Sequence, residues 1–224
     1  MNLTLPYPSK LRGAVKKIPG VKTFIDLNVI MEDCLFDLYH NVDTSSQLAA
    51  QQDLGWTTDE VNFHYLAIRP KCARRALRQL PLKARQEYTF IDFGSGKGRV
   101  LLIAAQYGFK RLGGIELRRE LHDQALKNFQ DRRNIPPCAM ESFNLDAGKY
   151  QFPNEKLVLF FFNPFGREVM TKVLKNLDTS LEVCKRDVWI LLHDSTSAYL
   201  IDRNSRFGLS VAKDGLRIYR TVAQ

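Results

Sequence analysis

The sequence predicts an α/β fold, in which a mostly parallel, doubly wound β-sheet follows a helical N-terminal extension. From residue 87 onward, short apolar runs of strand length alternate with longer runs of helix length, as a parallel sheet with crossover helices requires. The first 86 residues are typical of helix and loop. Residues 207–222 hold two alternating runs around an Asp-Gly pair, which predicts an antiparallel hairpin. We therefore divide the chain into a helical N-terminal cap, residues 1–86, and a core, residues 87–224.

The N-terminal cap is expected to contain two main helices. Residues 23–40 carry apolar side chains near helical spacing, which predicts the first helix. A short capped segment is expected from Ser45 and a break at 55–58. The second helix is expected within 62–80, after Pro70.

The core is expected to contain five strands before the hairpin. These strands are predicted at 88–93, 111–116, 138–143, 156–162 and 187–193, and the helices at 97–107, 119–131, 167–177 and around 179–185. The hairpin is expected to turn at Asp214 and Gly215.

Composition indicates a soluble globular protein. The chain has 224 residues, of which 45% are hydrophobic, and a net charge of +9, which fits one sizeable core with an extension. The longest apolar run, 157–162, is far shorter than the roughly 18 residues that cross a bilayer. The start of the chain lacks the pattern of a signal peptide. Four widely spaced cysteines predict neither disulfides nor a metal site. We therefore expect a cytoplasmic protein with no membrane partner.

Positive charge is concentrated in residues 69–85, where seven basic side chains occur without an acid. One interpretation is a surface that binds nucleic acid or another phosphate-bearing partner. The other is the solvated face of an amphipathic helix, and the sequence favours it. Its apolar stripe is formed by Ala73, Ala76, Leu77 and Leu80.

The most informative motif spans residues 88–98, which read YTFIDFGSGKG and precede a helix-length apolar run. A strand, a glycine turn and a helix N-terminus together present backbone amides and a positive helix end to a polar ligand. The glycines allow a sharp turn and a close approach of the ligand. Twenty residues after Gly96, Glu116 ends the next predicted strand. Its carboxylate could accept both hydroxyls of a ribose, or it could be a solvated strand-end acid.

The spacing D-x-G-x-G-x-G resembles motif I of the class I S-adenosylmethionine-dependent methyltransferases. This resemblance implies a Rossmann-like, seven-stranded sheet that ends in an antiparallel hairpin, with S-adenosylmethionine as the cofactor. It implies that Asp92 anchors the methionine ammonium or the turn, and that Glu116 holds the ribose. The implied cofactor-binding residues at the turn are Asp92, Gly94, Ser95, Gly96 and Gly98.

Two later strand ends carry further candidates. In the same family an acid at the position of Asp146 often binds the adenine amino group, and Ala147 would let the ring lie close; alternatively, Asp146 caps a turn. The run Asn163-Pro-Phe165 is similar to the [DN]-P-P-[YF] motif of amino-methyltransferases, although one proline is missing. We therefore expect Asn163 to contact the cofactor and, with Phe165, to act in catalysis. The alternative is a strand-ending turn before proline.

Residues 36–45 are similar to the loop that precedes the catalytic core in the non-SET histone-lysine methyltransferases. The layout also resembles a group of bacterial methyltransferase-like proteins. The resemblance implies that Asp43 and Thr44 reach the cofactor, whereas the alternative is a helix N-cap. His193 and Asp194 end the fifth predicted strand and are candidates for substrate contact.

The sequence thus predicts a methyltransferase that passes a methyl group to a nitrogen of a protein or small-molecule acceptor, by in-line displacement. One alternative is an NAD-dependent oxidoreductase, which would explain the glycines and Glu116 but not the motif spacing or the hairpin. A second alternative is a non-catalytic module that binds RNA or another acidic partner through residues 69–85. The sequence leaves the acceptor class and the oligomeric state open.

Overall fold

The computed structural model of the chain describes residues 21–45, 65–163, 165–193 and 196–222. Seven strands form one sheet in the order β3-β2-β1-β4-β5-β7-β6, and only β7 runs antiparallel to its neighbours. The predicted seven-stranded, mostly parallel sheet is therefore confirmed. The strands are β1 Thr89–Phe93, β2 Arg111–Glu116, β3 Met140–Asn144, β4 Leu157–Phe162, β5 Val188–His193, β6 Phe207–Lys213 and β7 Leu216–Thr221.

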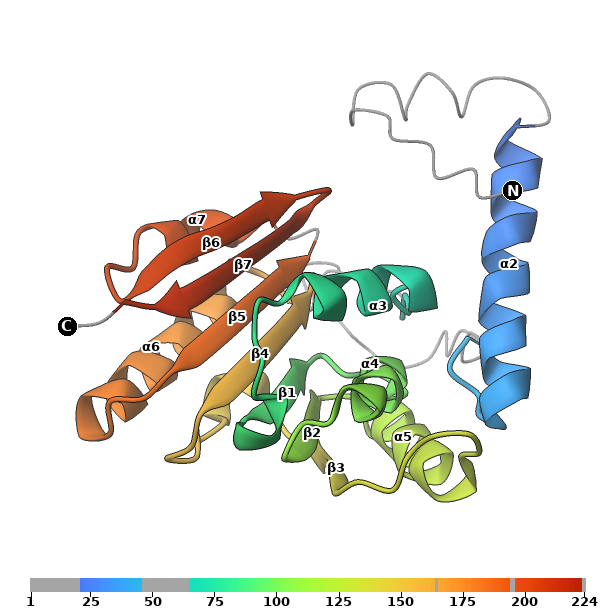
Figure 1. Ribbon diagram of the computed structural model, residues 1–224, viewed down its shortest axis with the longest axis horizontal. Helices are drawn as coiled ribbons and strands as arrows, with labels where there is room; N and C mark the ends of the chain where they lie inside the picture. Colours follow the sequence, from blue (N-terminus) through green and yellow to red (C-terminus); the bar gives the residue numbers. More distant parts are fainter. Residues whose placement is uncertain (1–20, 46–64, 164, 194–195, 223–224) are drawn as a thin grey trace, which may run out of the picture.

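Helices cover both faces of the sheet (Figure 1). One layer contains α3, α4 and α5, and the other contains α6 and α7. The helix α2 lies outside the first layer, on the far side of α3 from the sheet. The helices are α2 Val21–His40, α3 Pro70–Gln79, α4 Arg99–Ala104, α5 Arg119–Asp131, α6 Arg167–Val183 and α7 Ala198–Asp202, with short 3₁₀ turns at Arg85–Glu87, Ala105–Tyr107 and Ala147–Lys149.

The central strands are buried on both faces, because helices cover each side of the sheet. Successive side chains of a strand point to opposite faces. Phe90 and Phe160 accordingly join the core beneath α3, α4 and α5, whereas Ile91 and Phe161 join the core beneath α6 and α7. None of the described helices combines the length and apolarity needed to cross a bilayer.

The predicted hairpin is confirmed, and the turn chemistry explains its geometry. Asp214 and Gly215 have φ values of 51° and 79°, and a two-residue turn with both central residues at positive φ matches the twist of paired strands. The register Lys213↔Leu216 closes β6 onto β7.

Three predicted elements in the core need correction. The helices expected at 167–177 and around 179–185 are one helix, α6, because no glycine or proline interrupts the run and Leu177 and Leu181 continue its buried stripe. The third strand begins at Met140 rather than 138 and ends at Asn144, in register with β2. The short helix α7 was not predicted.

Two predictions concern the N-terminal cap. The first helix is confirmed as α2. The second helix begins only at Pro70; proline favours the first helical turn and keeps the preceding residue extended. Residues 62–64, at the start of the range predicted for this helix, lie outside the described residues. The predicted break at 55–58 and the predicted segment after Ser45 lie outside them as well.

Candidate cofactor site

The glycine turn joins the carboxyl end of β1 to the first residue of α4. Gly94, Gly96 and Gly98 have φ values of 74°, 53° and 82°, a region that side chains disfavour. The amides of Gly94 and Ser95 both donate to the carbonyl of Ile115 in β2, at 2.8 and 3.1 Å. The sequence thus uses glycine where the backbone must turn left-handed, and β2 holds the turn in place.

Two of these glycines also make room for side chains of the protein itself. A Cβ atom on Gly96 would lie 2.4 Å from the ring of Tyr65, and one on Gly98 would lie 2.5 Å from the ring of Phe129. The space expected for a ligand beside these two residues is therefore filled, on that side, by aromatic rings.

Glu116 is the last residue of β2 and is hydrogen-bonded to the glycine turn. Its Oε2 accepts from the amide of Gly96 and its Oε1 from the amide of Arg118, each at 2.8 Å. Burial raises the pKa of the Glu116 carboxyl, although these amide hydrogen bonds work in the opposite direction. The structure therefore brings Glu116 and the turn together, as the sequence predicted.

Asp92 lies in β1, two residues before the first glycine, and is only 3% exposed. Burial, followed by the charge of Glu116, raises the pKa of Asp92 well above its usual range. No cation is among the causes of this shift in the pKa of Asp92. Two carboxyl groups that are buried close together favour a proton or a cationic ligand.

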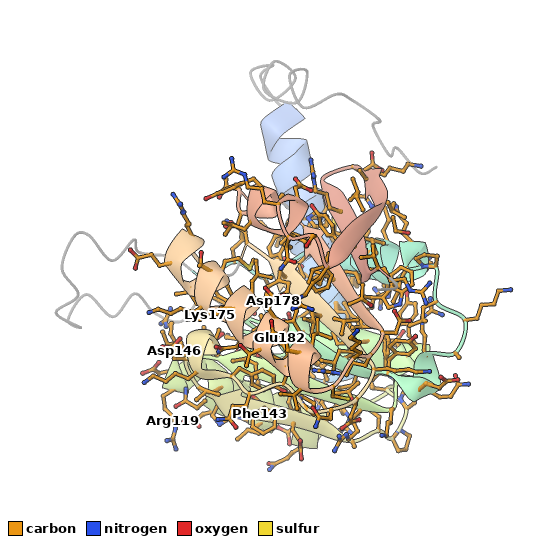
Figure 2. The ribbon with its side chains drawn as sticks, turned by 90° about the vertical axis from the view of Figure 1, so that its left-hand side faces the viewer. Arg119, Phe143, Asp146, Lys175, Asp178 and Glu182 are labelled. Atoms are coloured by element: carbon orange, nitrogen blue, oxygen red, sulfur yellow. The ribbon has the colours of Figure 1, made fainter. Side chains whose placement is uncertain are left out.

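Asp146 caps a turn, which is one of the two interpretations that the sequence offers. Its Oδ1 accepts from the amide of Gly148 at 2.9 Å and so caps the 3₁₀ turn that follows. This turn packs against α6, where Asn176 donates to the carbonyl of Gly148 at 2.8 Å. Figure 2 shows Asp146 beside α6. Ala147 is buried in the core on this side.

Asn163 and Phe165 lie at the carboxyl end of β4, on either side of a residue that is outside the described part of the chain. Asn163 is exposed and has a φ of 41°, a conformation that asparagine tolerates better than most residues. The ring of Phe165 packs edge-on against Phe161, with centroids 6.2 Å apart. At the end of β5, the His193 ring lies 5.6 Å from Phe162; Asp194 is not described.

Thr44 is fully buried and its hydroxyl is engaged within the protein. It donates to Asp37 at 2.5 Å and accepts from Nε of Arg99 at 2.7 Å. The neighbouring Asp43 carboxylate lies 3.1 Å from Nζ of Lys97. Both residues therefore reach the glycine turn, but through other side chains. The helix that they could cap falls outside the described residues.

Four residues that sequence reasoning did not single out lie at the turn. They are Tyr65, Lys97, Arg99 and Asn128. A signal was available for two of them, because basic residues at 97 and 99 interrupt an otherwise small and apolar stretch. Nothing in the spacing indicates that Asn128 in α5 contacts the turn.

Part of the basic stretch 69–85 is paired within the protein. Arg69 forms an ion pair with Glu32 at 2.6 Å, and Arg75 lies 3.5 Å from Asp214. Arg85 donates to carbonyls at the end of α3. These contacts support the amphipathic-helix interpretation.

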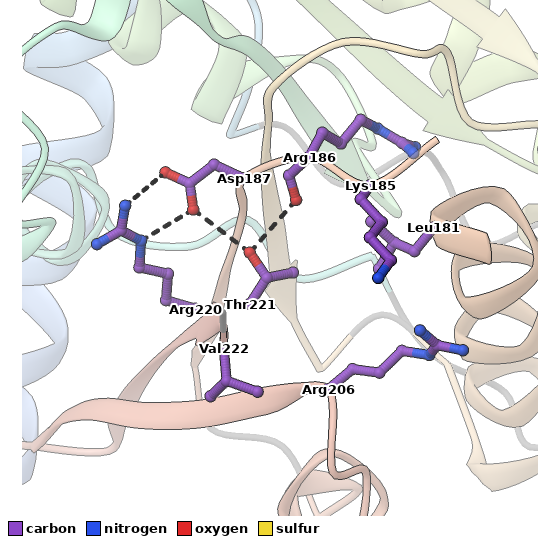
Figure 3. A pocket seen from close by; sticks show the side chains of 8 residues that line it. All are labelled: Leu181, Lys185, Arg186, Asp187, Arg206, Arg220, Thr221 and Val222. Carbon is purple, nitrogen blue, oxygen red and sulfur yellow. Dashed lines mark hydrogen bonds and ion pairs between the residues drawn. The ribbon is translucent and has the colours of Figure 1, made fainter. Parts of the chain in front are cut away.

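A hollow of about 450 Å³ lies at the opposite edge of the sheet, where β5 begins. Figure 3 shows Arg220 bonded to Asp187, and Thr221 joined to Asp187 and to the carbonyl of Arg186. Arg206 pairs with Glu182 at 2.8 Å, and Arg220 with Asp187 at 2.8 Å. The wall of the hollow therefore contains ion pairs that link parts of the fold, and it lies far from the glycine turn. Its lining residues are Leu181, Lys185, Arg186, Asp187, Arg206, Arg220, Thr221 and Val222.

Comparison with known proteins identifies the fold. No protein-family model matches the chain, and no curated protein matches its sequence. A structure described as a methylase from Haemophilus influenzae is 14% identical, with 67% of this chain and 88% of that chain covered and a TM-score of 0.50. One described as a methyltransferase from Escherichia coli is 17% identical, with 68% and 88% covered and a TM-score of 0.51.

These similarities and the topology define the fold. The chain has the class I methyltransferase fold: a Rossmann-like, doubly wound sheet that ends in an antiparallel hairpin. No group of side chains in the described residues could hold a metal ion.

Proposed function

We propose that the protein is an S-adenosylmethionine-dependent methyltransferase. The observation that carries the proposal is the bond between the glycine turn and the buried Glu116, at the carboxyl edge where ligands bind in open α/β sheets. When bound there, the cofactor supplies an activated methyl group.

The chemistry of the buried groups fits this cofactor. Burial raises the pKa of Asp92 and of Glu116, and an ammonium or sulfonium beside them would favour their charged forms. The buried hydroxyl of Ser95 makes no hydrogen bond within the described residues. A dinucleotide would instead bring the negative pyrophosphate next to two buried carboxyl groups. This electrostatic difference argues against an NAD-dependent oxidoreductase.

We assign the site residues by their places in the fold. Asp92 would bind the cofactor's amino group, Glu116 would hold the ribose, and Asp146 with Ala147 would bind the adenine. Gly94 and Ser95 would bring the turn close to the cofactor. Asn163 would contact the cofactor near the activated methyl group.

The acceptor would enter near Asn163 and Phe165, at the carboxyl ends of β4 and β5. Transfer to nitrogen needs the acceptor's lone pair in line with the bond between the methyl carbon and sulfur, which breaks. Exclusion of water supplies the rest of the rate acceleration. Arg69 and Arg75 of the basic stretch 69–85 are paired with acids, which favours a protein or a small molecule over nucleic acid as the acceptor. All four cysteines are free thiols, which suits the reducing cytoplasm.

Calorimetric titration with S-adenosylhomocysteine tests the proposal. Wild-type protein should bind it, and Glu116→Ala should bind at least about tenfold more weakly, because it loses both the ribose contact and the anchor of the turn. Gly96→Leu should likewise weaken binding severely, since the leucine side chain collides with the ring of Tyr65.

Glu120→Ala, which removes an exposed acid from α5, is the matched control and should bind normally. Undiminished binding by both site variants would refute the assignment. Fluorescence titration with NADH separates the oxidoreductase alternative, which requires NADH to bind.

A further inference from the structure

One buried amide connects three parts of the chain at the glycine turn. Asn128 of α5 is 2% exposed. Its Oδ1 accepts from the amide of Asp43, and its Nδ2 donates to the carbonyls of Asp43 and Lys97, each at 2.9 Å. A single side chain therefore joins the loop after α2 to the backbone of the turn.

The side chain of Lys97 makes a second connection between the same two segments. It is fully buried, and its Nζ lies 3.1 and 3.2 Å from the two carboxylate oxygens of Asp43. The ammonium also lies 5.7 Å from the centre of the Tyr65 ring. Pairing with Asp43 helps to stabilise this buried ammonium, so the ion pair ties the turn to the Asp43 loop.

Arg99, the first residue of α4, makes the third connection. Its guanidinium is 2% exposed and donates to Thr44 Oγ1 and to Asp33 Oδ1, each at 2.7 Å. It also donates to the carbonyl of Ile68 at 3.1 Å. The planar, branched donor set of arginine suits such simultaneous contacts.

The turn is thus held from two sides. On the side of the sheet, Glu116 accepts from the amide of Gly96. On the other side, the Tyr65 ring lies against Gly96 and its hydroxyl donates to the carbonyl of Thr44 at 2.8 Å. On this second side, Tyr65 and the segment 33–45 precede the core, whereas Asn128 belongs to it.

We propose that Lys97, Arg99 and Asn128 are positioning residues, which use segment 33–45 to hold the glycine turn in its cofactor-binding conformation. Asp43 and Thr44 then act through Lys97 and Arg99 rather than by touching the cofactor. This inference rests on the proposed function, because the property that it explains is affinity for the cofactor.

A double-mutant cycle on Asp43 and Lys97 tests the inference. Asp43→Asn removes negative charge beside a buried ammonium, so it should lower both the melting temperature and the affinity for S-adenosylhomocysteine. The double variant Asp43→Asn/Lys97→Met removes both charges, and its melting temperature should recover. Its affinity should stay about tenfold below that of wild type, equal to that of Lys97→Met alone, because the tie to the turn is lost in each variant.

Two outcomes would overturn the inference. One is wild-type affinity for S-adenosylhomocysteine in folded Lys97→Met. That result would mean that Asp43 does not act on cofactor binding through Lys97. The other is recovery of affinity together with the melting temperature in the double variant, since that would make the pair merely structural. As a control, Arg206→Met/Glu182→Gln removes a remote ion pair and should leave the affinity unchanged.

The failure of the proposed function is distinguishable from the failure of this inference. If wild-type protein binds no S-adenosylhomocysteine, the proposed function falls. Hydrogen exchange of the amides at 95–98 still reports whether segment 33–45 holds the turn. Faster exchange in Lys97→Met would support the inference that Lys97 ties the turn to segment 33–45. Unchanged exchange would overturn that inference.

Discussion

At the scale of single residues, the buried carboxyl groups of Asp92 and Glu116 determine how the site responds to pH. Burial raises the pKa of each, and in Asp92 the charge of Glu116 adds to the effect. Between the ordinary and the raised pKa of Asp92, the folded protein holds a proton that the unfolded chain has released. The contribution of Asp92 to stability therefore decreases as pH rises through that window.

Cofactor binding should favour the charged form of Asp92 over the protonated form and so release protons. A cationic group beside Asp92 favours the carboxylate, so we expect the affinity for S-adenosylmethionine to rise with pH until the raised pKa is passed. Calorimetry in buffers with different ionisation enthalpies measures the released protons directly. In Asp92→Asn, most of the buffer dependence should disappear. Equal heats for wild-type protein in all buffers would contradict the expectation.

At the scale of elements, one carboxylate ties together the amino ends of β1 and β5 and the carboxyl end of β7. Asp187 accepts from the hydroxyl of Tyr88 at 2.5 Å and from Nε and Nη2 of Arg220 at 2.8 and 2.9 Å. Arg220 in turn lies over Trp189, 4.9 Å from the ring centre. The two hydrogen bonds to Arg220 are drawn in Figure 3.

Replacing this carboxylate should make stability depend differently on pH. Burial alone would raise the pKa of Asp187, but hydrogen bonds from Arg220 and Tyr88 lower it. Its stabilisation is therefore present above the unfolded pKa and is lost as pH falls through the folded pKa. Asp187→Asn should cost about 1–3 kcal/mol in urea unfolding at neutral pH, and the difference should vanish in acid. A difference that persists at low pH would contradict this account.

The elements were largely predictable because their signals are local. The strands alternate or are continuously apolar, and Asp214-Gly215 specifies its turn without distant partners. The predicted boundary after residue 177 is wrong, because Leu177 and Leu181 are both buried on one continuous helix.

The site was only partly predictable, because several of its contacts join distant residues. Gly96 and Glu116 were predicted together, and they are hydrogen-bonded. The link from Asn128 to Asp43 spans 85 residues and has no sequence motif. Asp146 illustrates the opposite case, since a cap on its own turn is a local alternative that the sequence already offered.

At the scale of the whole molecule, the N-terminal cap and the core share one hydrophobic cluster. Phe36, Ala76 and Leu77 belong to the same buried group as Leu101 and Phe160. The two parts are therefore packed against each other across the boundary that we propose at residue 86.

Truncation tests this interdependence. A chain of residues 87–224 exposes the apolar surface of α4 that α3 covers and should fail to unfold cooperatively on heating. A chain that begins at residue 65 keeps α3 and should unfold cooperatively, but at a lower temperature than the full chain. A well-folded 87–224 fragment would show that the cap is dispensable for the core.

The placement of β7 between β5 and β6 has a consequence for biosynthesis. During translation, β6 emerges before the strand that must separate it from β5. Until residues 216–221 leave the ribosome, the nascent sheet presents the unpaired edge of β5, which could accept a wrong strand. Cellular chaperones that shield such edges would therefore matter most between the emergence of β5 and that of β7.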